Sequence, residues 1–133
     1  MQAGDLPDGV RQLIADSIDS VEQLEILLLL QQHPARTWTA ESVARELRVS
    51  ALSAGDRLED LTRDALLVRV KGNEEEYRYA PGSAALDEAA RGLATAYTER
   101  RVTVINLIFS KPVDKIRTFA DAFRLRKKED DNG

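Results

Sequence analysis

The sequence predicts a mainly α-helical domain that carries one small β-hairpin and ends in a long helix. Three observations lead to this class. Along most of the chain, apolar residues recur at intervals of three and four, which is the period of a helix that buries one face. Between residues 68 and 79 that period gives way to a two-residue alternation around a polar turn. From residue 83 the helical period returns and continues beyond residue 100.

Length and composition narrow the possible classes. A chain of 133 residues is long enough for one domain with a single core. The absence of cysteine excludes a disulfide framework and a thiolate zinc site. The longest apolar run, residues 26–30, is far shorter than the roughly 20 residues that cross a bilayer. The first ten residues lack the basic and then apolar pattern of a secretory signal, so we expect a cytoplasmic protein.

Two helices are predicted before residue 34. Apolar residues at helical spacing predict a short first helix; they are Val10, Leu13, Ile14 and Ile18. Ser20 with Gln23 three residues later has the spacing of a capping box, so a second helix is predicted to start there and to end near His33. The apolar run 26–30 would cover more than one face of this second helix. We therefore expect it to be central and buried on most sides.

The next segment predicts a helix-turn-helix unit over residues 39–64. Residues 37–39 suit a brief strand, with Trp38 in the core, and Thr39 is a good N-cap for a helix over 40–47. Ser50 caps a further helix, whose inner face is predicted to consist of Ala51, Ala54, Leu58, Leu61 and Ala65. Two helices joined by so short a turn form the helix-turn-helix arrangement.

A hairpin and a C-terminal region follow. Residues 68–70 and 77–79 alternate like strands on either side of a turn, which places the hairpin at 67–80 and closes a first unit over 1–82. Residues 83–128 are predicted to be helical and 129–133 to be a disordered tail. Apolar positions in steps of four and three predict a helix seam, which we expect to form a homodimer interface through Leu86, Leu93, Tyr97, Val104 and Leu107.

This order of elements resembles the winged-helix modules of small bacterial transcription regulators of the MarR-like and PadR-like groups. The matching stretch reads WTAESVARELRVSALSAGDRLEDLTRDALLVRV, and the resemblance covers roughly residues 20–81. It implies a winged helix-turn-helix fold, DNA binding as a homodimer on a palindromic site, and dimerisation through the long helix. One position departs from the pattern: Ala65 stands where these regulators commonly have glycine. We expect alanine to fit there if its φ is negative.

The resemblance also implies which side chains meet DNA. In such modules the N-terminal part of the second helix of the helix-turn-helix, here the helix capped by Ser50, enters the major groove. The hairpin, or wing, approaches the DNA backbone. Ser50, Ser53 and Arg57 are expected to face the groove, with Arg57 suited to guanine. Arg48, Arg69 and Lys71 are expected to contact phosphates.

The charge distribution leaves an alternative open. The formal net charge of −4 is unevenly distributed, with −5 over residues 1–35 and +7 over residues 100–128. Carboxylates near the DNA phosphates would weaken binding, because they oppose the release of counterions that drives it. Such carboxylates are present on the helix capped by Ser50, at Asp56, Glu59 and Asp60, and in the glutamates at 74–76. The alternative is a module that does not bind DNA and docks a basic protein surface with this acidic face. The basic C-terminal region could pack on the body or a second copy, contact phosphates, or lie on an anionic membrane surface. Only the first option needs no further assumption.

Catalytic chemistry finds no support in the sequence. The single histidine, His33, precedes Pro34 at a predicted helix end, where an imidazolium suits the helix dipole. The chain has no glycine-rich phosphate loop, no histidine and carboxylate spacing for a metal, and no nucleophile beside a base. The sequence therefore predicts neither an enzyme nor a cofactor or metal site.

Overall fold

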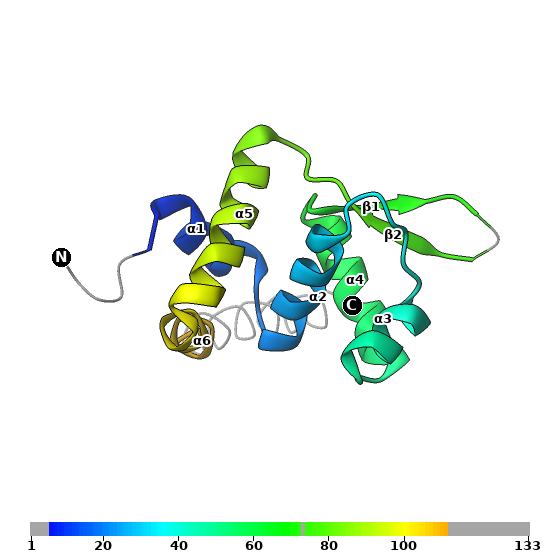
Figure 1. Ribbon diagram of the computed structural model, residues 1–133, viewed down its shortest axis with the longest axis horizontal. Coiled ribbons are helices and arrows are strands. Elements are labelled where there is room, and N and C mark those ends of the chain that lie inside the picture. Colours follow the sequence, from blue (N-terminus) through cyan, green and yellow to red (C-terminus); the bar gives the residue numbers. More distant parts are fainter. Residues whose placement is uncertain (1–5, 73, 112–133) are drawn as a thin grey trace, which may run out of the picture.

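The computed structural model describes residues 6–72 and 74–111 (Figure 1). Over these residues the elements are α1 (Asp8–Ser17), α2 (Val21–Gln32), α3 (Ala40–Leu47), α4 (Ala51–Arg63), β1 (Leu67–Val70), β2 (Glu76–Tyr79), α5 (Ala84–Glu99) and α6 (Arg101–Phe109). The mainly α-helical class with one small hairpin is confirmed. The part of the predicted helical region beyond residue 111 and the predicted tail 129–133 lie outside the described residues. The membrane contact considered for the basic C-terminal region falls largely in this part of the chain.

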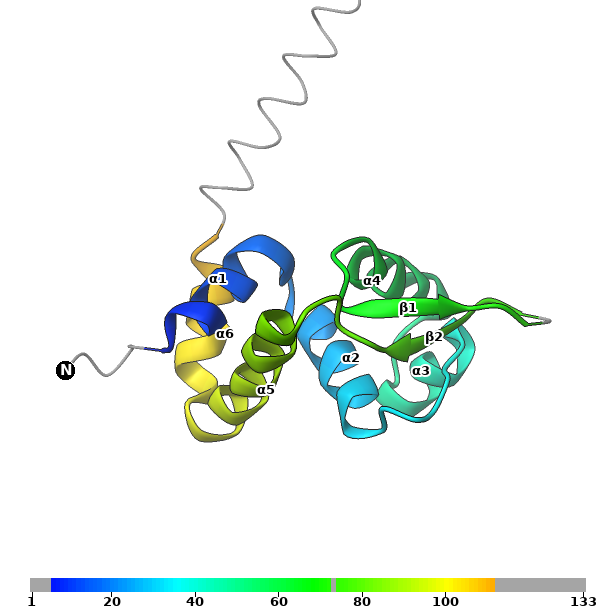
Figure 2. The ribbon, with the colours of Figure 1, turned by 90° about the horizontal axis from the view of Figure 1, so that it is seen from above.

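The helices form two groups on either side of α2 (Figure 2). One group contains α1, α5 and α6, which pack on one another, and the other contains α3, α4 and the hairpin. Leu24, Ile26, Leu27 and Leu30 of α2 have no exposed surface, and α2 contacts α3, α4 and β2. The prediction of a central, buried second helix is confirmed. Burial of this apolar run fixes α2 to the helix-turn-helix unit and to the hairpin.

Local capping chemistry sets the ends of the helix-turn-helix. Thr39 accepts a hydrogen bond from the backbone N–H of Ser42, whose hydroxyl accepts one from Thr39 N–H, so α3 begins with a capping box. α3 ends at Arg48, which has a left-handed backbone (φ 60°). Ser50 then accepts a hydrogen bond from Ser53 N–H and starts α4. Val43, Leu58 and Leu61 are fully buried on the inner side of the pair.

The hairpin is antiparallel, with Leu67 opposite Tyr79 and Val70 opposite Glu76. The predicted brief strand at 37–39 is present as one bridge: Trp38 and Tyr77 exchange two backbone hydrogen bonds of 2.8 Å. Trp38 is buried as expected, and the guanidinium carbon of Arg36 lies 3.6 Å from the centre of its ring. The bridge fixes β2 of the wing to the segment that leads into α3.

The long C-terminal helix is two helices, and this corrects the prediction. The helical backbone is interrupted at Arg100 (φ −136°, ψ 52°), where α5 ends and α6 begins. Because the chain turns there, Val104 and Ile108 of α6 are buried within the chain and α6 packs on both α1 and α5. Of the residues assigned to a dimer seam, Leu93, Tyr97 and Val104 are buried inside the chain, while Leu86 and Leu107 are half-buried. The buried three contribute to the core of the single chain.

Ala65 corrects a second expectation, because its φ is +67° and not negative. It follows α4, and the bonds Leu66 N–H to Leu61 C=O and Ala65 N–H to Thr62 C=O form a Schellman ending. The residue after a helix in this motif takes the left-handed conformation, which favours glycine. Alanine therefore occupies a strained position between α4 and β1.

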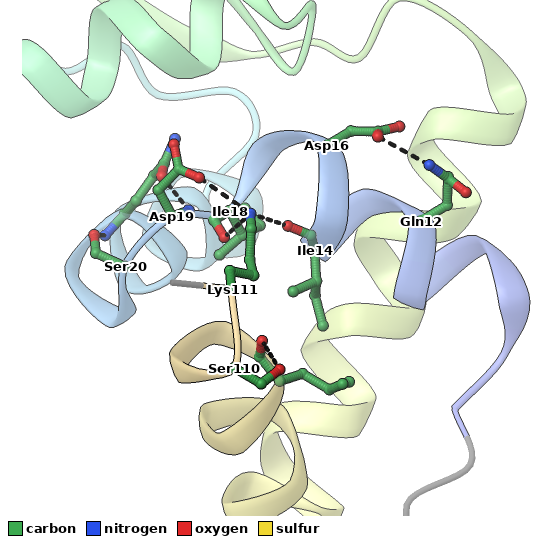
Figure 3. A network of polar contacts seen from close by, with 10 residues as sticks. Gln12, Ile14, Asp16, Ile18, Asp19, Ser20, Ser110 and Lys111 are labelled. Carbon is green, nitrogen blue, oxygen red and sulfur yellow. Dashed lines mark hydrogen bonds and ion pairs between the residues drawn. The ribbon is translucent and has the colours of Figure 1, made fainter. Parts of the chain in front are cut away.

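Lys111 is buried, although the sequence groups it with the basic C-terminal region (Figure 3). Its ammonium group donates to Ile14 C=O at 2.7 Å, to Ile18 C=O at 2.8 Å and to Asp19 Oδ1 at 3.1 Å, and its side chain is 10% exposed. The last carbonyls of a helix lack partners within it, and a cation stabilises that end. Lys111 therefore fixes the end of α6 to the junction between α1 and α2.

Candidate nucleic-acid interface

The outward face of α4 is defined by four exposed residues. They are spaced by four, three and four positions, and they are Leu52, Asp56, Glu59 and Arg63. This spacing places them on one side of a helix, opposite the buried Ala54, Leu58 and Leu61. The side of α4 that would enter a groove therefore presents two carboxylates, one arginine and a leucine.

Ser53 and Arg57, predicted to face the groove, point instead toward α2. The Ser53 hydroxyl donates to Glu22 Oε1 in a short hydrogen bond, and Arg57 Nε lies 3.6 Å from the same oxygen. The Arg57 side chain is 33% exposed. On a helix that turns about 100° per residue, Arg57 lies beside the buried Leu58, whereas Asp56 lies on the opposite face. The helical spacing in the sequence already places Arg57 beside the buried face of α4. It could not identify Glu22 as the partner, because that contact joins two different helices.

The turn before α4 places the next two predicted residues at the surface. Arg48 and Ser50 are both exposed. The Ser50 Oγ accepts the hydrogen bond that caps α4, so its free capacity is the hydroxyl proton. Arg48 forms no ion pair with any residue between 6 and 111 that the structure describes. Both groups lie at the surface just before the N-terminus of α4.

The wing is tied to α4 by an ion pair. Arg69 of β1 lies 2.8 Å from Glu59 of α4, and both side chains are about half exposed. The negative charge of Glu59 is the main reason that the pKa of Arg69 is raised. Lys71, at the end of β1, is exposed. Of the two wing cations predicted to touch phosphate, Arg69 is thus partly neutralised and Lys71 is available.

A shallow acidic groove lies between the start of α3, α4 and the wing. Its volume is about 200 Å³, and it is lined by Ala40, Ala51, Leu52, Gly55, Asp56, Glu59, Glu75 and Tyr77. The Tyr77 hydroxyl lies 3.4 Å from Glu75 Oε2. Burial raises the pKa of Tyr77, and Glu59 and Glu75 raise it further. The sequence predicted acids on both the helix and the wing, and the structure brings three of them to one groove.

Comparison with known proteins identifies the fold. No family model matches the chain, and no curated protein is detectably similar to it in sequence. Among solved structures, the chain is similar to the adhesin competence repressor (AdcR) of Streptococcus pyogenes, with a TM-score of 0.50 and 16% identity over 85% of each chain. The helix-turn-helix, the hairpin beside it and this similarity together define a winged helix-turn-helix fold.

Two further properties concern only the described part of the chain. No three or more histidine, cysteine, aspartate or glutamate residues within it are grouped so as to hold a metal ion. None of its helices combines the length and the apolar character needed to span a membrane.

Proposed function

We propose that this protein is a transcriptional regulator that binds duplex DNA through α4 and the wing, as a homodimer in the cytoplasm. The observation that carries the proposal is the arrangement of α4. Its capped N-terminus is exposed beside a hairpin, on a fold similar to that of a repressor. A helix presented in this way fits the major groove of DNA.

The cations available for phosphate contact lie at the two ends of this surface. Arg48 precedes α4 and Lys71 follows β1, and both are exposed. Between them, Asp56 and Glu59 reduce the electrostatic attraction. We therefore expect weak binding to DNA of mixed sequence and a shallow salt dependence, with specificity coming from contacts to bases at the N-terminal turn of α4.

The proposed dimer would form through the C-terminal half. Val102 and Phe109 on α6 are 70% and 66% exposed, and the half-buried Ile105 lies between them on the same side of the helix. With Leu86 and Leu107, these residues leave apolar surface for a second copy. A twofold dimer implies a palindromic site with half-sites one helical turn, or a multiple of it, apart. Sedimentation equilibrium of the full chain tests the dimer directly.

Salt-titrated binding to mixed genomic fragments tests the DNA proposal. The logarithm of the binding constant should fall linearly with the logarithm of the salt concentration. Lys71→Ala should reduce the slope by about one, because one phosphate contact is lost. Arg11→Ala is the matched control, since Arg11 is an exposed arginine on α1. A chain that shows no retention of DNA even at low salt would overturn the proposal.

The acidic groove supports a second candidate function, docking of a basic protein segment. Asp56, Glu59 and Glu75 line this groove, with the exposed Leu52 at the same site. The similarity to a repressor gives this candidate no support. It predicts that the protein binds a peptide rich in lysine and arginine and does not bind DNA. It also predicts that Asp56→Asn weakens the binding of that peptide.

A further inference from the structure

One carboxylate engages two of the three side chains that were expected to face the groove of DNA, Ser53 and Arg57. Glu22 lies in the first turn of α2, and its side chain is 28% exposed. It accepts the hydrogen bond of the Ser53 hydroxyl and forms the ion pair with Arg57. Ser53 and Arg57 are one turn apart on α4, so a single side chain on the neighbouring helix holds both.

The contact between Glu22 and Arg57 is weak enough for another acceptor to replace Glu22. The 3.6 Å between Arg57 Nε and Glu22 Oε1 is too long for a hydrogen bond. The Arg57 Nε atom is buried and has no hydrogen-bond partner among the described residues. Ion pairs at partly exposed sites contribute little stability. An acceptor that offered the guanidinium two aligned hydrogen bonds, as guanine and phosphate do, would bind it better.

The contact with Ser53 has a different consequence. A serine hydroxyl has one proton, and that proton is donated to Glu22. Phosphate oxygens only accept hydrogen bonds, so Ser53 has no donor to offer them while this bond exists. Release from Glu22 would restore the donor of Ser53 together with the guanidinium of Arg57.

We infer that Glu22 is a positioning residue that competes with DNA for Ser53 and Arg57 and so sets the selectivity of α4. This inference rests on the proposed DNA binding. A phosphate backbone of any sequence must displace a carboxylate that stays nearby and repels it. Binding at α4 is therefore favourable at sequences whose bases replace the contacts of Glu22 with Ser53 and Arg57. It is unfavourable at other sequences. Glu22 lowers affinity for mixed DNA and leaves well-matched sites less affected.

Removing the charge of Glu22 tests the inference. Glu22→Gln should raise the affinity for mixed-sequence duplex DNA about fivefold, the upper range for loss of one exposed ion pair. It should also steepen the salt dependence by about one, because Arg57 gains a phosphate contact. Glu46→Gln is the matched control, since Glu46 is an exposed acid on α3. Glu22→Asp, which keeps the charge but withdraws it by one methylene, should change affinity in the same direction and less.

A double-mutant cycle separates the possible failures. In an Arg57→Ala background, Glu22→Gln should raise affinity no more than Glu46→Gln does. If Glu22→Gln has no larger effect than the control, or if its gain persists without Arg57, the inference is wrong and the proposed function stands. If neither the parent chain nor any variant retains DNA at low salt, the proposed function itself is wrong. Circular dichroism of each variant shows that the compared chains are folded.

Discussion

Within the described residues, two that are not glycine adopt the left-handed backbone at helix ends, Arg48 with φ 60° and Ala65 with φ 67°. The Cβ atom makes this conformation unfavourable by roughly 1–2 kcal/mol. Both residues lie at the borders of the candidate interface, one before α4 and one between α4 and the wing. The chain accepts this strain because the flanking helix caps and the hairpin fix the backbone there.

Ala65→Gly should increase the free energy of unfolding by about 0.5–1 kcal/mol, since relief of left-handed strain exceeds the greater entropy of glycine in the unfolded chain. Chemical denaturation of the two chains measures the difference. Ala15→Gly, at an exposed helical position in α1, should have the opposite sign. A loss of stability in Ala65→Gly would show that the backbone at residue 65 is not strained.

The close approach of α1 and α5 depends on small residues. Gly9 of α1 faces Ala89 of α5, and Gly92 of α5 faces Val10 of α1. A Cβ atom at residue 92 would lie 2.7 Å from Val10 Cγ2, which is too short for any real contact. Val10 is buried, so it has little room to move. Gly92 is therefore the position at which the two helices leave no room for a side chain.

Gly92→Ala should lower the free energy of unfolding by about 1–3 kcal/mol, because the added methyl group overpacks the junction. Thermal or chemical denaturation measures the change. Gly9→Ala provides the control, since its Cβ would make an ordinary contact of 3.7 Å with Ala89. That variant should be neutral or slightly stabilised. Equal effects of the two substitutions would contradict the predicted clash.

Elements were predicted from the sequence where local chemistry sets them. Ser20, Thr39 and Ser50 each cap a helix as expected, because a capping hydrogen bond spans only three residues. The break at Arg100 was not predicted, since neither glycine nor proline marks it and the packing of α6 on α1 determines it. In the candidate site, too, features that depend on local position were predicted and features that depend on tertiary packing were not. Arg48 and Lys71 are exposed as their positions suggested, whereas the contacts of Glu22 with Ser53 and Arg57 join residues far apart in the chain.

The two halves of the molecule are joined through tyrosine hydroxyl groups. Tyr79 of β2 donates to Asp87 Oδ1 of α5 at 2.7 Å and lies 3.4 Å from Gln31 Nε2 of α2. Tyr97 of α5 donates to Glu25 Oε2 of α2 at 3.2 Å. Burial raises the pKa of both tyrosines, that of Tyr79 to about 12. The hydrogen bond from Tyr79 in turn lowers the pKa of Asp87, as does Arg91.

These bonds require neutral tyrosines, so the fold should weaken in alkali. In the unfolded chain Tyr79 ionises near its ordinary pKa of 10.0, whereas in the folded chain it ionises at about 12. The raised pKa means that its contribution is complete below pH 10 and is lost as the pH rises toward 12. Because burial is the main cause of the shift and penalises the ionised form, ionisation of Tyr79 over this range should lower the free energy of unfolding by an amount on the order of 2–3 kcal/mol. Chemical denaturation at a series of pH values measures the decline.

Tyr79→Phe isolates this contribution. At neutral pH the variant should be less stable by about 1 kcal/mol, because the hydrogen bond to Asp87 is lost. Between pH 10 and 12 its stability should decline less steeply than that of the parent, since one of the tyrosines with a raised pKa is gone. Absorbance of tyrosinate during alkaline titration should show that the tyrosine with a pKa of about 12 is missing. An unchanged slope in the variant would mean that the junction between wing, α2 and α5 does not depend on the protonation of Tyr79.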